Sequence, residues 1–385
     1  MSWTPNAHAG LMEQAMTRKI LKMAATPGLI SLAGGMPAPE SFPVDEIKAA
    51  VDRVLTDHSA TALQYGVSDG YQPLREWVSA DLAAKGADYP PDQILITNGS
   101  QQAISLASGI LLEDGAKLAI ETPTYLAAIS TFRPSGCTFV DMPCDEDGPI
   151  PAELRRVRDA RFAYIIPTFQ NPAGRMISAQ RRQAISETAH ELGLPLFEDN
   201  PYGELYYDGE PPAPLASFDP ENTIYGGSFS KVLSPGMRIG YVALPKKIYG
   251  DFLNLKSAVD VHTANLIQLI VYEVVKDGFL TTHLDKVRAR YKVHRDAMDA
   301  ALKKYMPADA VWETPAGGMF FWVTLPEGTD TGALLDTAVK AGVAFVPGEA
   351  FYAVDPPKNS LRLSFVTVSP EQIDAGVKIL AELLR

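Results

Sequence analysis

The chain has 385 residues, of which 46% are hydrophobic and 21% are charged, a composition typical of globular proteins. Its length exceeds what one small core needs and predicts a large domain with a smaller one. A net charge of -12 disfavours nucleic acid or an anionic membrane as a partner, because phosphate groups would be repelled.

Other bulk features concern the compartment and possible metals. The two cysteines, Cys137 and Cys144, are too few for a disulfide framework and are typical of a reducing cytoplasm. The first residues, MSWTPNAHAGLMEQ, lack the apolar stretch of a secretory signal, and the sequence has no apolar run long enough to span a membrane. The histidines are scattered. We therefore expect a cytoplasmic protein without a metal site.

Short apolar runs alternate with helical patterns through the middle of the chain. Helices are predicted over 101–112 and 179–192. Strands are predicted over 92–100, 117–125, 137–145, 161–174, 194–202 and 222–231. This alternation predicts an α/β fold with a mostly parallel central sheet sandwiched by helices. Ligands of such sheets bind beyond the carboxyl ends of the strands, where several polar residues of this chain fall.

The pattern changes towards the end of the chain. Residues 245–305 are mainly helical, and strands at 317–326 and 359–368 enclose a helix at 331–342. A last helix begins after Ser369, a favourable N-cap. We therefore predict a large domain over 45–280, a smaller α/β domain over 281–385, and an N-terminal arm, 1–44, that packs on the smaller domain.

Lys231 lies in GGSFSKVLSPGMRIGY, residues 226–241, among glycines, serines and apolar residues. A lysine in an apolar, partly closed site loses hydration, so its pKa falls and the neutral amine can form a Schiff base with a carbonyl. A solvated loop lysine is the alternative, and it is the commoner case when this segment is taken alone. The segment matches neither a phosphate-binding P-loop nor a nucleophile elbow.

A second group of residues would seat a phosphate. Hydroxyl groups flank the lysine, a cation follows it, and backbone N–H groups at a helix start add to them. The members of this group are Gly99, Ser100, Gln101, Ser228, Ser230 and Arg238.

A third group would hold a heteroaromatic ring. Asp199 ends an apolar strand and would meet a protonated ring nitrogen, although it could also be a turn carboxylate. Tyr202 and Asn171 would meet a ring oxygen, and Tyr125 one ring face, although packing or turn roles are open to each. One ligand uses all these groups at once, namely pyridoxal 5'-phosphate (PLP), bound covalently to Lys231. Lys231, Asp199 and Tyr202 are the expected catalytic residues.

These motifs together resemble the fold-type I PLP-dependent aminotransferases of class I/II. The resemblance is closest to the branch that contains 2-aminoadipate and kynurenine aminotransferases. The matching stretches run in family order and include SLAGGMPAPESFP, LQYGVSDGYQPLREW, TNGSQQAISL, TFQNPAGRMIS, EDNPYGEL, GGSFSKVLSPGMRIGY and NSLRLSF.

The resemblance implies further site residues. Arg362 matches an arginine that clamps the substrate α-carboxylate, and Gly34 and Gly35 match a backbone segment that lines the substrate pocket. Arg18 matches an arginine on an N-terminal helix that contacts the substrate side chain in some members, although helical surface arginines are common. The residues expected to bind substrate are Arg362, Asn171, Gly35, Gly34 and Arg18.

The resemblance also implies an assembly and a reaction. Tyr65, in LQYG, matches a tyrosine that reaches the phosphate of the neighbouring subunit, so we expect a homodimer with shared active sites. The reaction would move an amino group from an L-amino acid, aromatic or 2-aminoadipate-like, to a 2-oxo acid such as 2-oxoglutarate. The alternatives are a PLP-dependent lyase on the same fold and a PLP-binding regulatory domain. Regulators of that kind carry a basic DNA-binding segment before the domain, whereas here a short arm precedes SLAGGMP and the chain is acidic.

Overall fold

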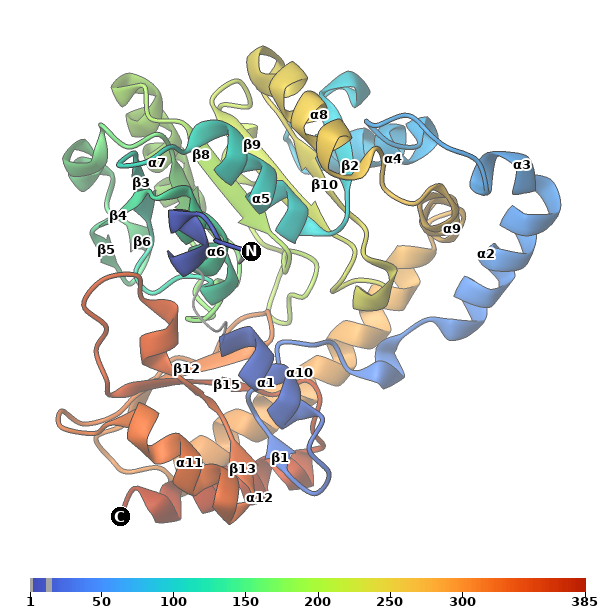
Figure 1. The fold of residues 1–385 in the computed structure, drawn as a ribbon. Helices are drawn as coiled ribbons and strands as arrows, with labels where there is room; N and C mark the ends of the chain where they lie inside the picture. Colours follow the sequence, from blue (N-terminus) through green and yellow to red (C-terminus); the bar gives the residue numbers. More distant parts are fainter. Residues whose placement is uncertain (1–2, 12–15) are drawn as a thin grey trace.

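The computed structural model describes residues 3–11 and 16–385, and within them seven strands form the central sheet of the molecule (Figure 1). The strands lie in the order β2-β10-β9-β8-β7-β3-β4. Their bounds are β2 Ile94–Thr97, β3 Lys117–Ile120, β4 Thr138–Asp141, β7 Ala163–Ile165, β8 Leu196–Asn200, β9 Thr223–Ser228 and β10 Gly240–Ala243. Six of them fall inside the predicted strand segments, and all but β10 run parallel. The predicted fold class is confirmed.

Both faces of this sheet are buried under helices, because successive side chains of each strand point to opposite sides. In β2, Ile94 and Ile96 pack against one group of helices, and Leu95 packs against another. The first group is α2 Val44–Asp57, α4 Gln72–Ala84 and α9 Asn265–Val275, with α7 Ala179–Leu192 further along the same face. The second group is α5 Ser100–Leu111, α6 Leu126–Phe132 and α8 Lys246–Asp260.

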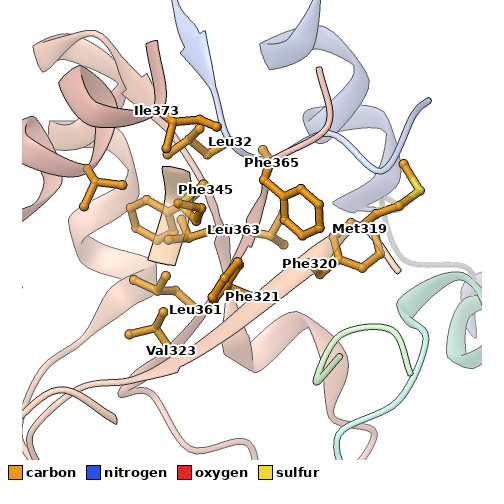
Figure 2. Packing of buried hydrophobic residues seen from close by; sticks show 14 of the residues in the cluster. Leu32, Met319, Phe320, Phe321, Val323, Phe345, Leu361, Leu363, Phe365 and Ile373 are labelled. Carbon is orange, nitrogen blue, oxygen red and sulfur yellow. The ribbon is translucent and has the colours of Figure 1, made fainter. Parts of the chain in front are cut away.

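A smaller antiparallel sheet, in the order β11-β12-β15-β14, forms the second unit, drawn in orange and red in Figure 1. Its strands are β11 Val311–Trp312, β12 Phe320–Thr324, β14 Val346–Pro347 and β15 Ser360–Ser364. Its helices are α11 Thr331–Ala341 and α12 Pro370–Leu383. Phe321, Leu363 and Phe365 form its core together with Leu32 from the N-terminal arm (Figure 2). Ser369 caps α12 through a reciprocal capping box with Gln372, as the sequence predicted.

Most of the described arm lies against the smaller unit. Strand β1 (Ile30–Ser31) pairs in parallel with β13 (Val343–Ala344), and helix α1 (Met16–Ala24) buries Ile20 in the same core. Residues 7–11 lie instead on the larger unit, where the His8 ring is 2.7 Å from the Pro134 carbonyl oxygen. Helix α10 (Phe279–Tyr305) passes without a break from one unit to the other, so the predicted boundary at 280/281 falls within it.

The remaining short elements include helix α3 Ser59–Ala62 and the hairpin strands β5 Cys144–Asp145 and β6 Gly148–Pro149. Across the described parts of the chain, no helix has the length and apolar character that crossing a bilayer requires.

Candidate active site

A cavity of about 230 Å³ opens beyond the carboxyl ends of β8 and β9, and the smaller unit closes part of it through Arg362 of β15. Most of the residues predicted for the site line this cavity. They are Gly35, Ser100, Gln101, Tyr125, Asn171, Asp199, Tyr202, Ser228, Ser230, Lys231, Arg238 and Arg362. The parallel strands therefore bring together residues that lie far apart in the sequence.

The amine of Lys231 stands in the middle of this set. Its Nζ donates a hydrogen bond to the Gly35 carbonyl oxygen at 2.8 Å and lies 6.0 Å from the centre of the Tyr202 ring. Burial lowers the pKa of this amine to about 8, and the positive charges of Arg362 and Arg238 act in the same direction. The neutral, nucleophilic amine is therefore accessible near neutral pH.

Asp199, near the end of β8, is only 2% exposed. Its Oδ2 accepts a hydrogen bond from the Tyr164 hydroxyl at 2.5 Å, whereas its Oδ1 has no hydrogen-bond partner among residues 3–11 and 16–385. Burial raises the pKa of this carboxyl to about 6, and the bond from Tyr164 opposes the rise. A buried carboxylate oxygen without a donor is costly, so this oxygen calls for a proton-bearing group of a ligand in the cavity.

A cluster of donors gathers at the N-terminus of α5. Gly99, with φ +78°, precedes the helix, and a Cβ at this position would lie 2.5 Å from Nη2 of Arg238. Only glycine therefore lets the guanidinium approach the helix start this closely. Arg238 donates to the Asn98 carbonyl oxygen at 3.1 Å, and the Ser228 hydroxyl accepts from the backbone of Ser230 at 3.1 Å. A helix N-terminus, a cation and hydroxyl groups make a suitable seat for a phosphate.

Arg362 lies at the other side of the cavity and is almost wholly buried. Its Nη1 donates to Oδ1 of Asn171 and its Nη2 to the Ala33 carbonyl oxygen, both at 2.8 Å. The side-chain amide of Asn171 in turn donates to the Tyr202 hydroxyl at 3.3 Å. The rings of Phe320 and Phe351 flank the guanidinium, whose pKa burial lowers to about 10.

The two glycines of the arm that were expected to line the substrate pocket, Gly34 and Gly35, differ in position. A Cβ on Gly35 would lie 3.3 Å from the Phe320 ring and 3.9 Å from Nη2 of Arg362, so this residue faces the cavity. A Cβ on Gly34 would instead face Met36 and Ala24, and Gly34 does not line the cavity.

Tyr65 and Arg18 lie outside the cavity of their own chain. The Tyr65 side chain is 81% exposed and contacts the ring of His262 edge to face. Arg18 is exposed on α1, and the same helix lines the cavity through Thr17, Ile20 and Leu21, which were not predicted.

Two further residues at the site, Tyr164 and Ile166, were not predicted from the sequence either. Tyr164, the partner of Asp199, lies in a wholly buried strand and has the sequence pattern of a core residue. Ile166 lines the cavity from the loop that follows the same strand. Nothing in the local sequence separates these residues from ordinary core positions, whereas the amphipathic pattern of α1 could have indicated its inward face.

A family model described as aminotransferase class I and II matches residues 28–380. The chain belongs to this family. This aminotransferase is 42% identical to aromatic-amino-acid aminotransferase 1 of Thermococcus litoralis, over 97% of its own length and 92% of that protein. It is therefore an enzyme that transfers amino groups, as predicted.

Two solved structures are closely similar to this aminotransferase. One is a kynurenine aminotransferase from Pyrococcus horikoshii, with 38% identity, a TM-score of 0.94 and coverage of 99% of this chain and 96% of that one. The other is an alpha-aminoadipate aminotransferase from Thermus thermophilus, complexed with N-(5'-phosphopyridoxyl)-L-leucine. Its identity is 37% and its TM-score 0.93, over 100% of this chain and 98% of that one. The predicted family branch and dependence on PLP are confirmed.

Proposed function

We propose that this enzyme moves the amino group of an L-amino acid to a 2-oxo acid such as 2-oxoglutarate, with Lys231 as the residue that binds PLP covalently. The observation that carries the proposal is that one cavity holds both a lysine amine of lowered pKa and a buried oxygen of Asp199 that has no hydrogen-bond partner among the described residues. When bound, PLP supplies an aldehyde for the amine and a ring that takes up electrons from the substrate Cα.

Different lining residues would bind different parts of the cofactor. Ser228, Ser230, Arg238 and the backbone of Gly99, Ser100 and Gln101 would hold the phosphate. The free Oδ1 of Asp199 would accept from the ring nitrogen and keep it protonated. Asn171 and Tyr202 would donate to the ring oxygen, and Tyr125 would cover one ring face.

The remaining groups act on the substrate. The two terminal nitrogens of Arg362 form a planar fork that suits a carboxylate. A substrate carboxylate held there would fix the orientation of the Cα–H bond. Nζ of Lys231, once the substrate amine has replaced it and set it free, would take the proton from Cα and return it later, which requires an amine that changes its protonation near neutral pH.

We infer an aromatic or otherwise largely apolar donor side chain, with a 2-aminoadipate-like donor as the alternative. The cavity wall formed by the arm and α6 carries Ile20, Leu21, Met36 and Leu126, which suit an apolar side chain. Arg18 is exposed on the same turn of α1 as the lining residues Thr17, Ile20 and Leu21 but does not itself line the cavity. The site of action is the cytoplasm, in line with the use of only two cysteines.

We also infer a homodimer with shared active sites. Leu63, Tyr65 and Val67 are exposed beside Val259 and Val261, and the Tyr65–His262 contact joins these two segments. An exposed apolar patch of this kind is typical of a surface that a partner covers. A second copy of the chain would bring its Tyr65 to the phosphate seat.

The attachment is tested by reducing the holoenzyme with borohydride and mapping the labelled peptide. We expect the label on Lys231 and not on Lys256, a buried lysine paired with Asp260. A label elsewhere would refute the assignment.

The reaction type is tested by adding an aromatic amino acid without an acceptor. One equivalent of its 2-oxo acid per subunit should form, and turnover should resume on addition of 2-oxoglutarate. Continuous product release without an acceptor would indicate a lyase.

A further inference from the structure

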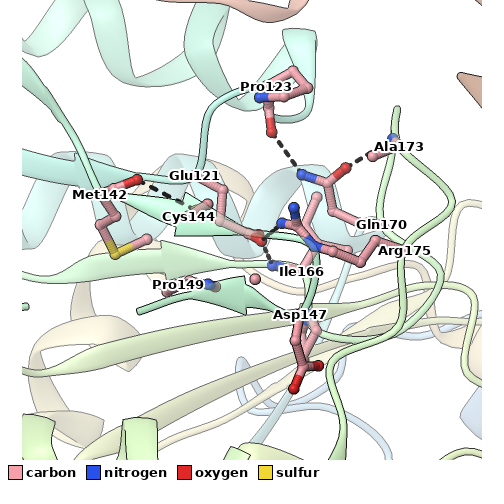
Figure 3. A network of polar contacts seen from close by, with 12 residues as sticks. Glu121, Pro123, Met142, Cys144, Asp147, Pro149, Ile166, Gln170, Ala173 and Arg175 are labelled. Carbon is pink, nitrogen blue, oxygen red and sulfur yellow. Dashed lines mark hydrogen bonds and ion pairs between the residues drawn. The ribbon is translucent and has the colours of Figure 1, made fainter. Parts of the chain in front are cut away.

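A polar network joins the residues that follow β3 to the loop that follows β7 (Figure 3). Its centre is Glu121, the first residue after β3, which is wholly buried. Oε2 of Glu121 accepts from the backbone of Ile166 at 2.7 Å, and Oε1 accepts from Nη2 of Arg175 at 2.6 Å. Ile166 begins the loop that carries Asn171, and Arg175 lies on the far side of Asn171 in the same loop. One carboxylate therefore ties this loop, on both sides of Asn171, to the residue that follows β3.

A second tie joins the same two segments. The side chain of Gln170 donates to the Pro123 carbonyl oxygen at 2.6 Å and accepts from the backbone of Ala173 at 2.8 Å (Figure 3). Gln170 precedes Asn171 directly, and Pro123 lies two residues before Tyr125. The loops that deliver these two cavity residues are thus linked to each other.

The loop has a backbone conformation that it would not favour alone. Phe169 is buried with φ +49°, a region that a residue with a bulky side chain rarely adopts. A Cβ on Gly174 would lie 3.0 Å from the Phe320 carbonyl oxygen. Such a conformation persists only where the surrounding contacts impose it, and the ties to Glu121 are among these contacts.

We propose that the Glu121–Arg175 ion pair positions Asn171 for its contacts with Arg362 and with the ring oxygen of PLP. The inference rests on the proposed function, which assigns Asn171 to that oxygen. Neither Glu121 nor Arg175 lines the cavity, so the pair acts through the loop. A carboxylate buried this deeply requires its cation, because an unpaired buried charge is strongly destabilising. Arg175 opposes the rise that burial causes in the pKa of Glu121.

The test uses the pH titration of the visible absorbance of the bound cofactor, which reports the ionisation of its ring system. A hydrogen bond from Asn171 to the ionised oxygen lowers the midpoint, so Asn171→Ala should raise it by about one pH unit. Glu121→Gln should raise it in the same direction, by at least half as much. The double variant Glu121→Gln/Arg175→Met should behave likewise and leaves no charge buried without its partner.

The matched control is Asp159→Asn. Asp159 forms an ion pair with Lys117, which lies at the other end of β3 from Glu121. This substitution should leave the midpoint unchanged. If both Glu121 variants titrate like the parent while Asn171→Ala shifts the midpoint, the pair does not position Asn171 and the inference is overturned. If Asn171→Ala itself causes no shift, the assignment of Asn171 to the ring oxygen is wrong, and the inference is lost with it. A general loss of stability would lower the unfolding temperature without moving the midpoint.

Discussion

Nη1 of Arg362 donates a hydrogen bond to Oδ1 of Asn171 at 2.8 Å, and this bond joins β15 of the smaller unit to the loop after β7 of the larger one. A second bond, to Ala33, fixes the plane of the guanidinium from the arm. Three separate parts of the chain thus determine how Arg362 is oriented. The guanidinium is therefore already oriented before a substrate carboxylate binds, so binding does not have to restrict its motion.

Replacing Arg362 with lysine should test this preorganisation. Lysine keeps the charge but has no planar fork, so it cannot form the paired hydrogen bonds. We expect kcat/KM for the amino acid to fall roughly 100-fold, mainly through KM, because each charged hydrogen bond is worth about 1.5–3 kcal/mol. The control is Arg161→Lys, which alters an exposed ion pair with Glu113. Equal KM values for the two variants would contradict the role of Arg362.

Gly99→Ala should damage the phosphate seat by displacing Arg238. Gly115 provides a matched control, because its φ of +75° is almost the same and a Cβ there would meet nothing within 4 Å. Both substitutions should cost about 1 kcal/mol of stability through backbone strain. Only Gly99→Ala should also weaken PLP binding, by about tenfold or more, as measured by fluorescence titration of the apo-protein. Equal affinities in the two variants would show that the close approach of Arg238 has no part in binding.

Much of the site could be predicted from the sequence, because its residues sit where strands end. Asp199 closes an apolar run, Ser228 ends another, and Lys231 follows in a segment of small residues. In a parallel sheet these ends meet at one edge, so local patterns alone bring the residues together. Arg362 is different, because only the family resemblance suggested its role.

Other parts of the molecule depend on contacts that a local pattern does not record. Strand β10 was not predicted, because GYVA is only four residues long and begins with a glycine, which gives a weak strand signal. Tyr164 meets Asp199 across neighbouring strands. Glu121 and Arg175 are 54 residues apart, and the pairing of β3 with β7 brings them together. Their spacing carries no signal without the register of β3 and β7.

The lowered pKa of Lys231 should appear in the pH dependence of cofactor capture. The amine reacts only when neutral, so the rate at which apo-protein captures PLP should rise about tenfold per pH unit and level off above pH 8, where the pKa of Lys231 lies. A free lysine derivative should show a rate that keeps rising towards pH 10, because its amine is fully hydrated. The measurement is the initial rate of absorbance change after mixing. A rate for the protein that rises steadily to pH 10 would contradict the lowered pKa.

Shared active sites can be tested by mixing two defective variants. If Tyr65 serves the neighbouring subunit, a hybrid of a Lys231→Ala chain and a Tyr65→Ala chain contains one site with both residues intact. Random assortment makes half of the dimers hybrids, so activity at limiting PLP should recover to about a quarter of the parent value. The control mixes Lys231→Ala with Asp199→Ala. These residues belong to the same cavity, so neither site of that hybrid is intact and no recovery is expected. Equal activity in the two mixtures would show that Tyr65 does not act across the interface.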